Sequence, residues 1–216
     1  MKDCVFCNKE KIKDDLIYEG KNFLIKVGFG ILAPGQVMII PKEHYLCFGE
    51  LPDELEEEHE KLKSLFQESI TKRFSTPFLF EYGIWGQSVK HAHEHLIPLI
   101  SKDYKVDSIL EEMIIPGGTK FEEVDRKKLK EIYKYEGKYV SIEEGGKLYV
   151  CHVNDLQDTR DHVYLNIRLF FTRIKGVKGI KNWSEMSEED KKLGEEKRNL
   201  TKMGLADIIS SNNKLK

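Results

Sequence analysis

The segment GQSVKHAHEHLIPLI, residues 86 to 100, contains three histidines that are spaced two residues apart. The rest of this segment is largely apolar, so the pattern predicts an extended strand. Alternate side chains of a strand share one face, and we therefore expect His91, His93 and His95 to point the same way, about 7 Å apart. A solvated edge strand would explain one histidine. Three in register indicate chemistry, because imidazole acts near neutral pH as nucleophile, acid, base or zinc ligand.

The charge and hydropathy of the chain limit its partners. Lys and Arg total 35 and Asp and Glu total 37, so no overall field favours nucleic acid or an anionic membrane. No apolar run approaches the roughly 18 residues of a membrane span, and the N-terminal MKDCVFCNKE has no apolar signal core. We therefore expect a cytoplasmic protein with no membrane partner.

The four cysteines do not suggest a disulfide framework in a reducing compartment. Cys4 and Cys7 form a C-x2-C pair, whereas Cys47 and Cys151 stand alone. A closed structural zinc site needs four nitrogen or sulfur ligands, so this pair would require two more from elsewhere. The alternative is a pair of reduced, inert thiols.

The first 105 residues predict an α+β unit. The expected elements are strands at 16–27, 36–45, 77–83 and 90–100 and a long helix at 51–74. Near-helical spacing of five apolar residues supports the helix: Leu55, Leu62, Leu65, Phe66 and Ile70. The Pro34-Gly35 turn separates the first two strands.

Residues 106–216 predict a mixed α/β extension. The expected elements are helices at about 121–135, 162–176 and 187–210 and a hairpin at 138–153 that turns at Gly145-Gly146. No low-complexity linker separates the two parts. We therefore expect two units, 1–105 and 106–216, with the second packed on the first.

The histidine segment resembles the signature of the histidine-triad (HIT) superfamily, His-x-His-x-His followed by apolar residues. GQSVKH resembles the loop before the triad in the fragile-histidine-triad and nucleotide-phosphoramidase branches. FEYG at 80–83 and CVFC at 4–7 are similar to bacterial and archaeal members that carry zinc. The four motifs occur in the family's order over residues 1 to about 100, and the rest looks similar to the extension of long members. The resemblance implies the HIT fold, an antiparallel sheet with a long helix packed on it.

The resemblance also implies a nucleotidyl hydrolase or transferase that acts on a nucleotide-containing small molecule. In the family, the central histidine attacks the α-phosphorus of a nucleotide ester, anhydride or phosphoramidate, and water or another acceptor resolves the covalent nucleotidyl-histidine. Family positions assign the nucleophile to His93 and the phosphoryl-oxygen donors to His95 and Ser88. They place Gln87 near the bridging or leaving-group oxygen.

Zinc-carrying members, and the related galactose-1-phosphate uridylyltransferases, complete their metal site with two histidines. The matching residues here are His44 and His91, which would join Cys4 and Cys7. Because all four positions would be filled by protein, the expected zinc ion is structural and not catalytic.

Three positions depart from the family pattern. Gln36 stands where many members have a histidine, and Gly28 stands where an Asp or Asn usually bonds the ribose. Glu94 replaces a residue that is usually apolar, and we expect it to be paired or at an interface, because burial of a lone carboxylate is costly. Gln36 and Gly28 leave open a nucleotide- or phosphate-binding module with little turnover.

A nucleic-acid deadenylase like the aprataxin branch has less support, because the charge is balanced and no C2H2 finger follows the triad. Smaller HIT proteins commonly form homodimers, but here the extension could occupy that surface. We expect His59 at the surface and no second metal site at Cys151, His152 and His162. The basic residues Arg160, Arg168, Arg173 and Lys175 are expected to be solvated, with polyphosphate contact as the alternative.

Overall fold

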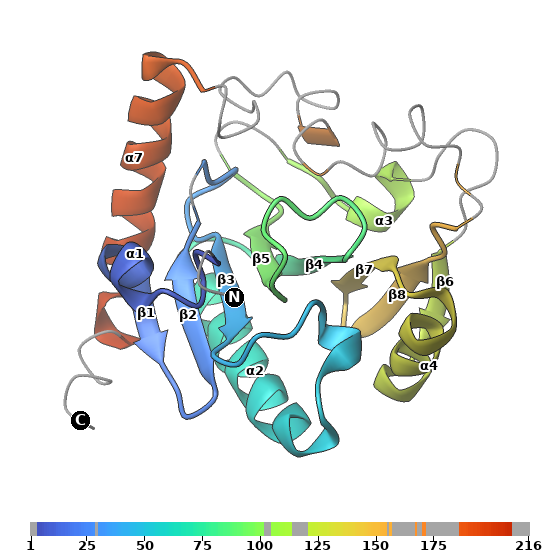
Figure 1. Cartoon of the computed structure of the whole chain (residues 1–216). Helices are drawn as coiled ribbons and strands as arrows, with labels where there is room; N and C mark the ends of the chain where they lie inside the picture. The colour runs from blue at the N-terminus through green and yellow to red at the C-terminus, as the bar shows by residue number, and fades with distance from the viewer. Residues whose placement is uncertain are drawn as a thin grey trace.

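A single antiparallel sheet forms the centre of the molecule (Figure 1). The computed structural model describes residues 4–28, 30–101, 105–113, 121–154, 156, 167, 170–171 and 186–208. Within these ranges the sheet has eight strands in the order β1-β2-β3-β5-β4-β7-β8-β6. The α+β prediction, an antiparallel sheet with a long helix packed on it, is confirmed.

The strands are β1 Leu16–Glu19, β2 Phe23–Val27, β3 Val37–Pro41, β4 Pro77–Gly83, β5 Glu94–Pro98, β6 Phe121–Val124, β7 Tyr139–Glu144 and β8 Lys147–Cys151. The helices are α1 Lys9–Ile12, α2 Glu56–Arg73, α3 Ile109–Glu112, α4 Arg126–Glu136 and α7 Glu188–Gly204. None of the helices in the described ranges combines the length and hydropathy needed to span a bilayer.

Helix α2 covers one face of the first half of the sheet, as the sequence predicts. Its Leu62, Phe66 and Ile70 recur every four residues and are buried in one cluster with Ile39 of β3 and Leu96 of β5. Side chains at this spacing share one side of a helix. Burial of this apolar stripe therefore fixes α2 against the sheet. Leu65, which was predicted on the same stripe, is instead 41% exposed.

Two predicted elements differ from the structure. Residues 16–27 form a hairpin, β1 and β2, and not one strand, because the polar segment from Gly20 to Asn22 turns and the Gly20 amide donates to the Phe23 carbonyl. The predicted helix at 121–135 begins only at Arg126, where the Asp125 side chain caps the Lys128 amide. Residues 121–124 instead form the edge strand β6, paired with β8.

The predicted strand at 90–100 is also shorter than expected. β5 begins at Glu94, so His91 and His93 lie just before it. The reason is that the backbone there bonds away from the ladder: the His91 amide donates to the Val89 carbonyl and the Ala92 amide donates to the Tyr45 carbonyl. His91 and His93 thus lie in the loop that leads into β5, and only His95 lies in the strand.

The C-terminal half continues the sheet of the first half. Strand β7 pairs with β4, and the β7–β8 hairpin turns at Gly145 and Gly146, both with positive φ. The helix predicted at 162–176 is described only in part. Three of its apolar residues are buried in one cluster with Phe78 and Phe80 of β4: Ile167, Phe170 and Phe171. The others named for this helix lie outside the described residues: Val163, Ile174 and Gly176. The predicted helix at 187–210 is α7, which starts with a capping box of Ser187 and Asp190. The division at residue 105 stays a prediction.

Glu94 lies buried on the sheet face that α2 and α4 cover. Its Oε2 is 2.9 Å from Nε2 of His59, and its Oε1 is 3.5 Å from Nη2 of Arg126. The expectation that Glu94 is paired is therefore confirmed. The surface location predicted for His59 is wrong: its side chain is 0% exposed, packs on the Phe48 ring and bonds the buried Glu94 carboxylate.

The ion pairs around Glu94 keep it charged. Burial alone would raise the pKa of Glu94, but the charges of His59, Arg126 and Lys63 and the hydrogen bond from His59 lower it to about 2. A carboxyl whose pKa is depressed in the folded state contributes stability above its unfolded pKa, and that stability is lost as the pH falls toward the folded value.

We expect Glu94→Gln to lower the free energy of unfolding by about 3 kcal/mol near neutral pH, because it leaves buried cationic partners uncompensated. The difference from the wild type should shrink as the pH falls from about 4.5 toward about 2, where the wild-type carboxylate is itself protonated. Urea unfolding at neutral and acid pH measures both. The control Glu57→Gln removes an exposed carboxylate paired with Lys61 and should change nothing measurable. Equal losses in the two variants would contradict this role of Glu94.

Candidate functional site

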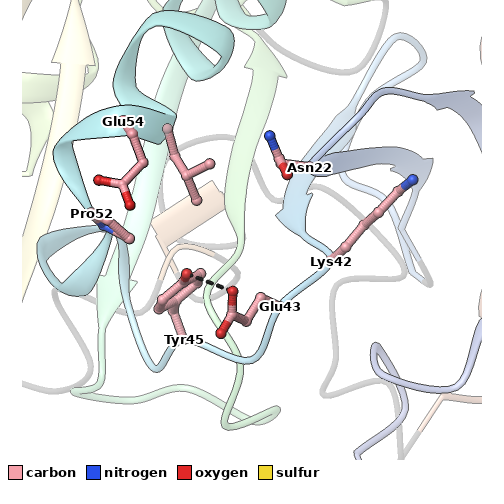
Figure 2. Close-up of a pocket in the computed structure, with 7 residues that line it drawn as sticks. Asn22, Lys42, Glu43, Tyr45, Pro52 and Glu54 are labelled. Carbon is pink, nitrogen blue, oxygen red and sulfur yellow. Dashed lines mark hydrogen bonds between the residues drawn. The ribbon is translucent and has the colours of Figure 1, made fainter.

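A surface pocket opens beside His44 but does not contain the three histidines (Figure 2). It is lined by Asn22, Lys42, Glu43, Tyr45, Pro52, Glu54 and Leu55. The Tyr45 hydroxyl donates to Glu43, and Asn22 donates to Glu58, so its polar groups are largely engaged within the protein. The candidate site is therefore built from the histidine segment and not from this pocket.

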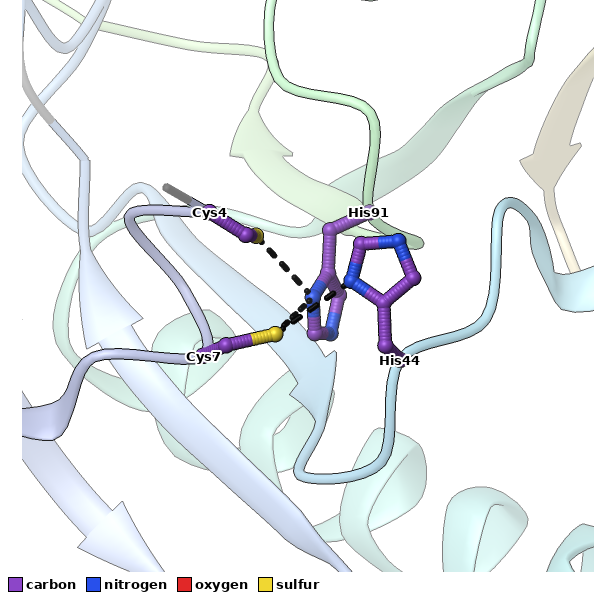
Figure 3. A group of neighbouring side chains, drawn as sticks. All are labelled: Cys4, Cys7, His44 and His91. Carbon is purple, nitrogen blue, oxygen red and sulfur yellow. Dashed lines mark hydrogen bonds between the residues drawn. The ribbon is translucent and has the colours of Figure 1, made fainter. Parts of the chain in front are cut away.

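The His91 ring joins the N-terminal cysteines to β3. Its Nε2 is 2.8 Å from the Pro41 carbonyl oxygen. Because a carbonyl only accepts, Nε2 carries the proton and the lone pair is on Nδ1. Nδ1 lies 3.4 Å from the Sγ atoms of both Cys4 and Cys7, as Figure 3 shows. The backbone thus presents this ring to the thiols as a ligand would be presented.

Four side chains meet at this point: Cys4, Cys7, His44 and His91. Nδ1 of His44 is 3.3 Å from Sγ of Cys7, and the four donor atoms lie within 4.8 Å of one another. The two cysteines sit in the turn before α1, and His44 follows β3. Thiolate and imidazole donors in this arrangement could hold one transition-metal ion.

Phe6 anchors the turn that carries the two cysteines. Its side chain is buried in a cluster with Ile12 and Ile40. Its ring also meets the rings of His91 and His93 edge to face, at centroid distances of 5.8 and 5.3 Å. The N-terminal turn therefore packs directly against the histidine segment, which the C-x2-C spacing alone did not indicate.

The His93 ring is held in the opposite tautomer to that of His91. Its Nδ1 is 2.8 Å from the His91 carbonyl oxygen, so Nδ1 donates and the lone pair is on Nε2. The side chain is 6% exposed. Burial, with a smaller effect from the charge of Lys26, lowers the pKa of His93 to about 4. The ring is therefore neutral near pH 7, with a nucleophilic nitrogen.

Gln36 orients the third histidine. Its Oε1 accepts from the Leu32 amide at 2.6 Å, which directs its amide nitrogen to Nδ1 of His95 at 3.4 Å. An amide N–H only donates, so His95 accepts on Nδ1 and carries its proton on Nε2. The centroids of the His93 and His95 rings are 5.1 Å apart, closer than the about 7 Å expected from strand rise, because only His95 lies in the strand.

The two residues predicted beside the triad lie on the loop that precedes it. Gln87 is buried, and its amide nitrogen donates to the Leu46 carbonyl at 2.8 Å. Its Oε1 is buried and has no hydrogen-bond partner among the described residues. Ser88 is exposed, and no hydrogen bond within the described ranges connects it to His93 or His95. The loop follows Ile84, whose φ of 74° is strained for a β-branched residue.

Lys26 is a buried cation that the sequence analysis missed. It lies on the sheet face that carries His95, because Lys26 pairs with Met38 and Met38 pairs with His95 across three strands. Burial lowers the pKa of Lys26 to about 8, and a carboxylate oxygen of Asp15 lies 3.9 Å from its Nζ. The signal was a single lysine in the apolar strand FLIKV.

Gly28 leaves room for a side chain. A Cβ there would be 3.4 Å from the Met38 methyl group, an ordinary contact. Packing therefore does not require glycine at position 28.

Two further histidine clusters are ion-pair networks. Glu56, His59 and Glu60 lie close enough to hold a metal ion, but Glu56 pairs with Lys130 at 2.8 Å and Glu60 with Lys63 at 2.6 Å. These cations already neutralise the carboxylates. His152 bonds Glu136 and Glu122. His162 and the basic residues Arg160, Arg168, Arg173 and Lys175 lie outside the described residues.

Comparisons with known proteins match about half of this chain. Residues 9–101 match the family model described as HIT domain. An uncharacterized HIT-like protein of Methanocaldococcus jannaschii is 27% identical over 114 residues, which cover 48% of this chain and 84% of that protein. One of Borreliella burgdorferi is 29% identical over 113 residues, covering 48% and 80%. A solved HIT-family structure from Bacillus subtilis is 27% identical, with a TM-score of 0.41 and coverage of 46% and 75%.

We expect the cysteine and histidine cluster to bind one Co²⁺ ion per chain. Tetrahedral thiolate coordination gives intense sulfur-to-cobalt charge-transfer bands and visible ligand-field bands. Cys7→Ser should remove or strongly weaken these bands. Cys47→Ala, which alters a buried thiol outside the cluster, should retain them. Bands that persist in Cys7→Ser and vanish in Cys47→Ala would contradict this assignment.

Proposed function

Because residues 9–101 form a HIT domain and place this chain in the HIT superfamily, we propose that it is a nucleotidyl hydrolase or transferase. It acts at the α-phosphorus of a nucleotide ester, anhydride or phosphoramidate through a covalent nucleotidyl-histidine. The observation that carries this proposal is the His93 ring: neutral, buried, and held by the His91 carbonyl so that Nε2 keeps its lone pair. A neutral imidazole so oriented is an activated nucleophile that needs no separate base.

In the first step, Nε2 of His93 attacks the α-phosphorus. The Nε2–P bond forms as the bond from phosphorus to the leaving group breaks, and the leaving group departs with that electron pair and takes a proton from solvent. The phosphorylated ring is cationic, and its Nδ1–H stays on the His91 carbonyl, 2.8 Å away. This bond strengthens as charge develops on the ring, so it favours the intermediate over the free enzyme.

In the second step, water or another acceptor attacks phosphorus from the opposite side. The Nε2–P bond breaks, its electron pair returns to Nε2, and the acceptor loses its proton to solvent. Splitting the transfer in two lets a single nucleophile serve both the donor and the acceptor. A hydrolase and a transferase differ only in the acceptor.

His95, Gln87 and Ser88 act on the phosphoryl oxygens and the leaving group. His95 carries its proton on Nε2, and a donor of that kind stabilises the charge that develops on a phosphoryl oxygen. Gln87, with its amide nitrogen held by Leu46, lies near the bridging oxygen, and Ser88 donates to a phosphoryl oxygen. Ser88 is exposed on its loop, so its contact forms when substrate fills the site.

The metal in the cysteine and histidine cluster is proposed to be structural zinc. A tetrahedral zinc ion with usual bond lengths separates sulfur from nitrogen by roughly 3.5 Å, and the corresponding distances here are 3.3 to 3.4 Å. The lone pair of His91 Nδ1 already faces the thiols. Zinc would join the N-terminal turn to the histidine segment, and four protein ligands would leave no position for water.

Residues 106–216 are proposed to shape the choice of acceptor or leaving group, as a unit packed on residues 1–105. Support comes from β7, which continues the sheet next to β4, and from α7, which runs beside the β2–β3 loop. A nucleotide-binding module with little turnover is the second candidate. Gln36 and Gly28, which depart from the family pattern, favour it, and a Cβ at position 28 would make only ordinary contacts, so packing does not require this glycine.

The test is intact-mass detection of a nucleotide adduct. The protein is mixed briefly with adenosine phosphoramidate, dinucleoside polyphosphates, nucleotide sugars or an adenylated DNA end, and spectra are recorded without acid, which hydrolyses phosphohistidine. We expect one nucleotidyl group per chain on His93, because its Nε2 is the nucleophile. His93→Ala should abolish the adduct, and His152→Ala, a histidine held by two surface carboxylates, should retain it.

Three results would overturn parts of this proposal. Saturable nucleotide binding without adduct or turnover would support the binding module. An adduct that survives in His93→Ala would move the nucleophile. Reaction with the adenylated DNA end alone would make the protein a nucleic-acid deadenylase.

A further inference from the structure

Helix α7 contacts the loop between β2 and β3 through two polar side chains. Nζ of Lys197 donates to the Leu32 carbonyl at 3.0 Å, and the Gly35 amide donates to the Thr201 hydroxyl at 2.8 Å. Both α7 residues are buried. Residues from the last part of the chain thus satisfy backbone groups on both sides of the turn before β3.

These contacts hold a backbone segment that has little freedom of its own. Gly35 has a φ of 92°, and a Cβ there would meet the Phe74 ring at 2.7 Å. Gly204, near the end of α7, approaches the same ring. The turn therefore lies between the end of α2 and α7. Its buried Gly35 amide needs an acceptor, and the Thr201 hydroxyl provides it.

The same loop fixes the residue that orients His95. Leu32 accepts from Lys197 with its carbonyl and donates with its amide to Oε1 of Gln36. That bond settles which end of the Gln36 amide faces His95, and the amide nitrogen then donates to Nδ1 of His95. A chain of contacts leads from α7, through residues 32 to 36, to the third histidine of the triad.

We propose that Lys197 and Thr201 of α7 are positioning residues for the triad, because they hold the 32–36 loop so that Gln36 keeps the proton of His95 on Nε2. This inference rests on the proposed function, in which His95 donates from Nε2 to a phosphoryl oxygen. Under this proposal α7 contributes to catalysis indirectly, by positioning His95, although neither Lys197 nor Thr201 contacts the substrate.

The proposal accounts for glutamine at position 36. An amide can accept from Leu32 and donate to His95 at the same time, which a carboxylate cannot do. Gln36→Glu keeps the shape and the bond from Leu32 but places an acceptor against Nδ1 of His95. The His95 proton should then move to Nδ1, or the ring should become an imidazolium.

The test uses isosteric changes with matched controls in the full-length, metal-loaded protein. Thr201→Val removes the acceptor of the Gly35 amide, and Thr201→Ser restores it. Thr71→Val is the control, because Thr71 also bonds the carbonyl four residues before it, but on an exposed part of α2. Lys197→Met keeps the apolar stem of a buried lysine, and Lys192→Met makes the same change on the exposed face of α7.

Two readouts separate positioning from general stability. The first is the ring ¹⁵N chemical shifts of His95 in histidine-labelled protein, which report its tautomer without any substrate. We expect them to change in Thr201→Val, Lys197→Met and Gln36→Glu, and to match the wild type in Thr201→Ser, Thr71→Val and Lys192→Met. The His59 ring, on the other sheet face, should be unchanged throughout and shows that each variant is folded.

The second readout is turnover of the substrate that labels His93. We expect kcat to fall between about 10- and 100-fold in Thr201→Val and Lys197→Met with little change in KM, because a misplaced donor weakens the transition state more than binding. Unchanged His95 shifts in a folded Thr201→Val protein would overturn the proposal. If no substrate reacts with the wild type, the proposed function fails, yet the His95 shifts still decide whether α7 positions the ring. If Lys197→Met does not fold, the Thr201→Val and Thr201→Ser pair decides alone.

Discussion

The hydrogen bond from Nδ1 of His93 to the His91 carbonyl joins the two parts of the site. His91 directs its ring to the cysteines and its carbonyl to His93, so one residue contacts both the candidate metal cluster and the proposed nucleophile. In the proposed mechanism, a metal held by this cluster would help to orient His93 through His91.

The three histidines differ because each has a different backbone or amide partner. The Pro41 carbonyl holds the proton of His91 on Nε2, the His91 carbonyl holds that of His93 on Nδ1, and Gln36 holds that of His95 on Nε2. Two neighbouring rings thus present a lone pair and a proton. In the proposed mechanism, these opposite tautomers let His93 act as the nucleophile while His95 donates a hydrogen bond.

Glu94 connects this face of the sheet to the other. Its side chain points away from the triad and joins His59 of α2 to Arg126 of α4, so the start of β5 is tied to helices from both halves of the chain. Buried ion pairs are costly to desolvate and are weak evidence for net stability. Their directional contacts hold the first residue of β5 to α2 and α4.

Residue types and spacing were enough to predict the long helix and the β7–β8 hairpin. The meeting of Cys4 and Cys7 with His44 and His91 was expected only from the resemblance to zinc-carrying HIT proteins. The shortened β5 could not be foreseen, because it depends on the Ala92 amide bonding the Tyr45 carbonyl rather than the ladder.

His59 was misplaced for a related reason. Helical spacing predicts which side of α2 carries His59. It does not show that a buried carboxylate of β5, Glu94, lies opposite that side. The contact of Lys197 with the 32–36 loop could not be predicted from local patterns, because the two segments are 165 positions apart in the chain. The positions of both side chains depend on contacts between segments that are far apart in the chain, which a local pattern does not show.

The most direct test of the opposite tautomers of His93 and His95 is a long-range ¹H–¹⁵N correlation spectrum of the histidine rings near neutral pH, recorded on metal-loaded protein without substrate. We expect His93 to carry its proton on Nδ1 and a lone pair on Nε2, while His95 shows the reverse arrangement. A His93 ring protonated on Nε2, or both rings in the same tautomer, would contradict these assignments.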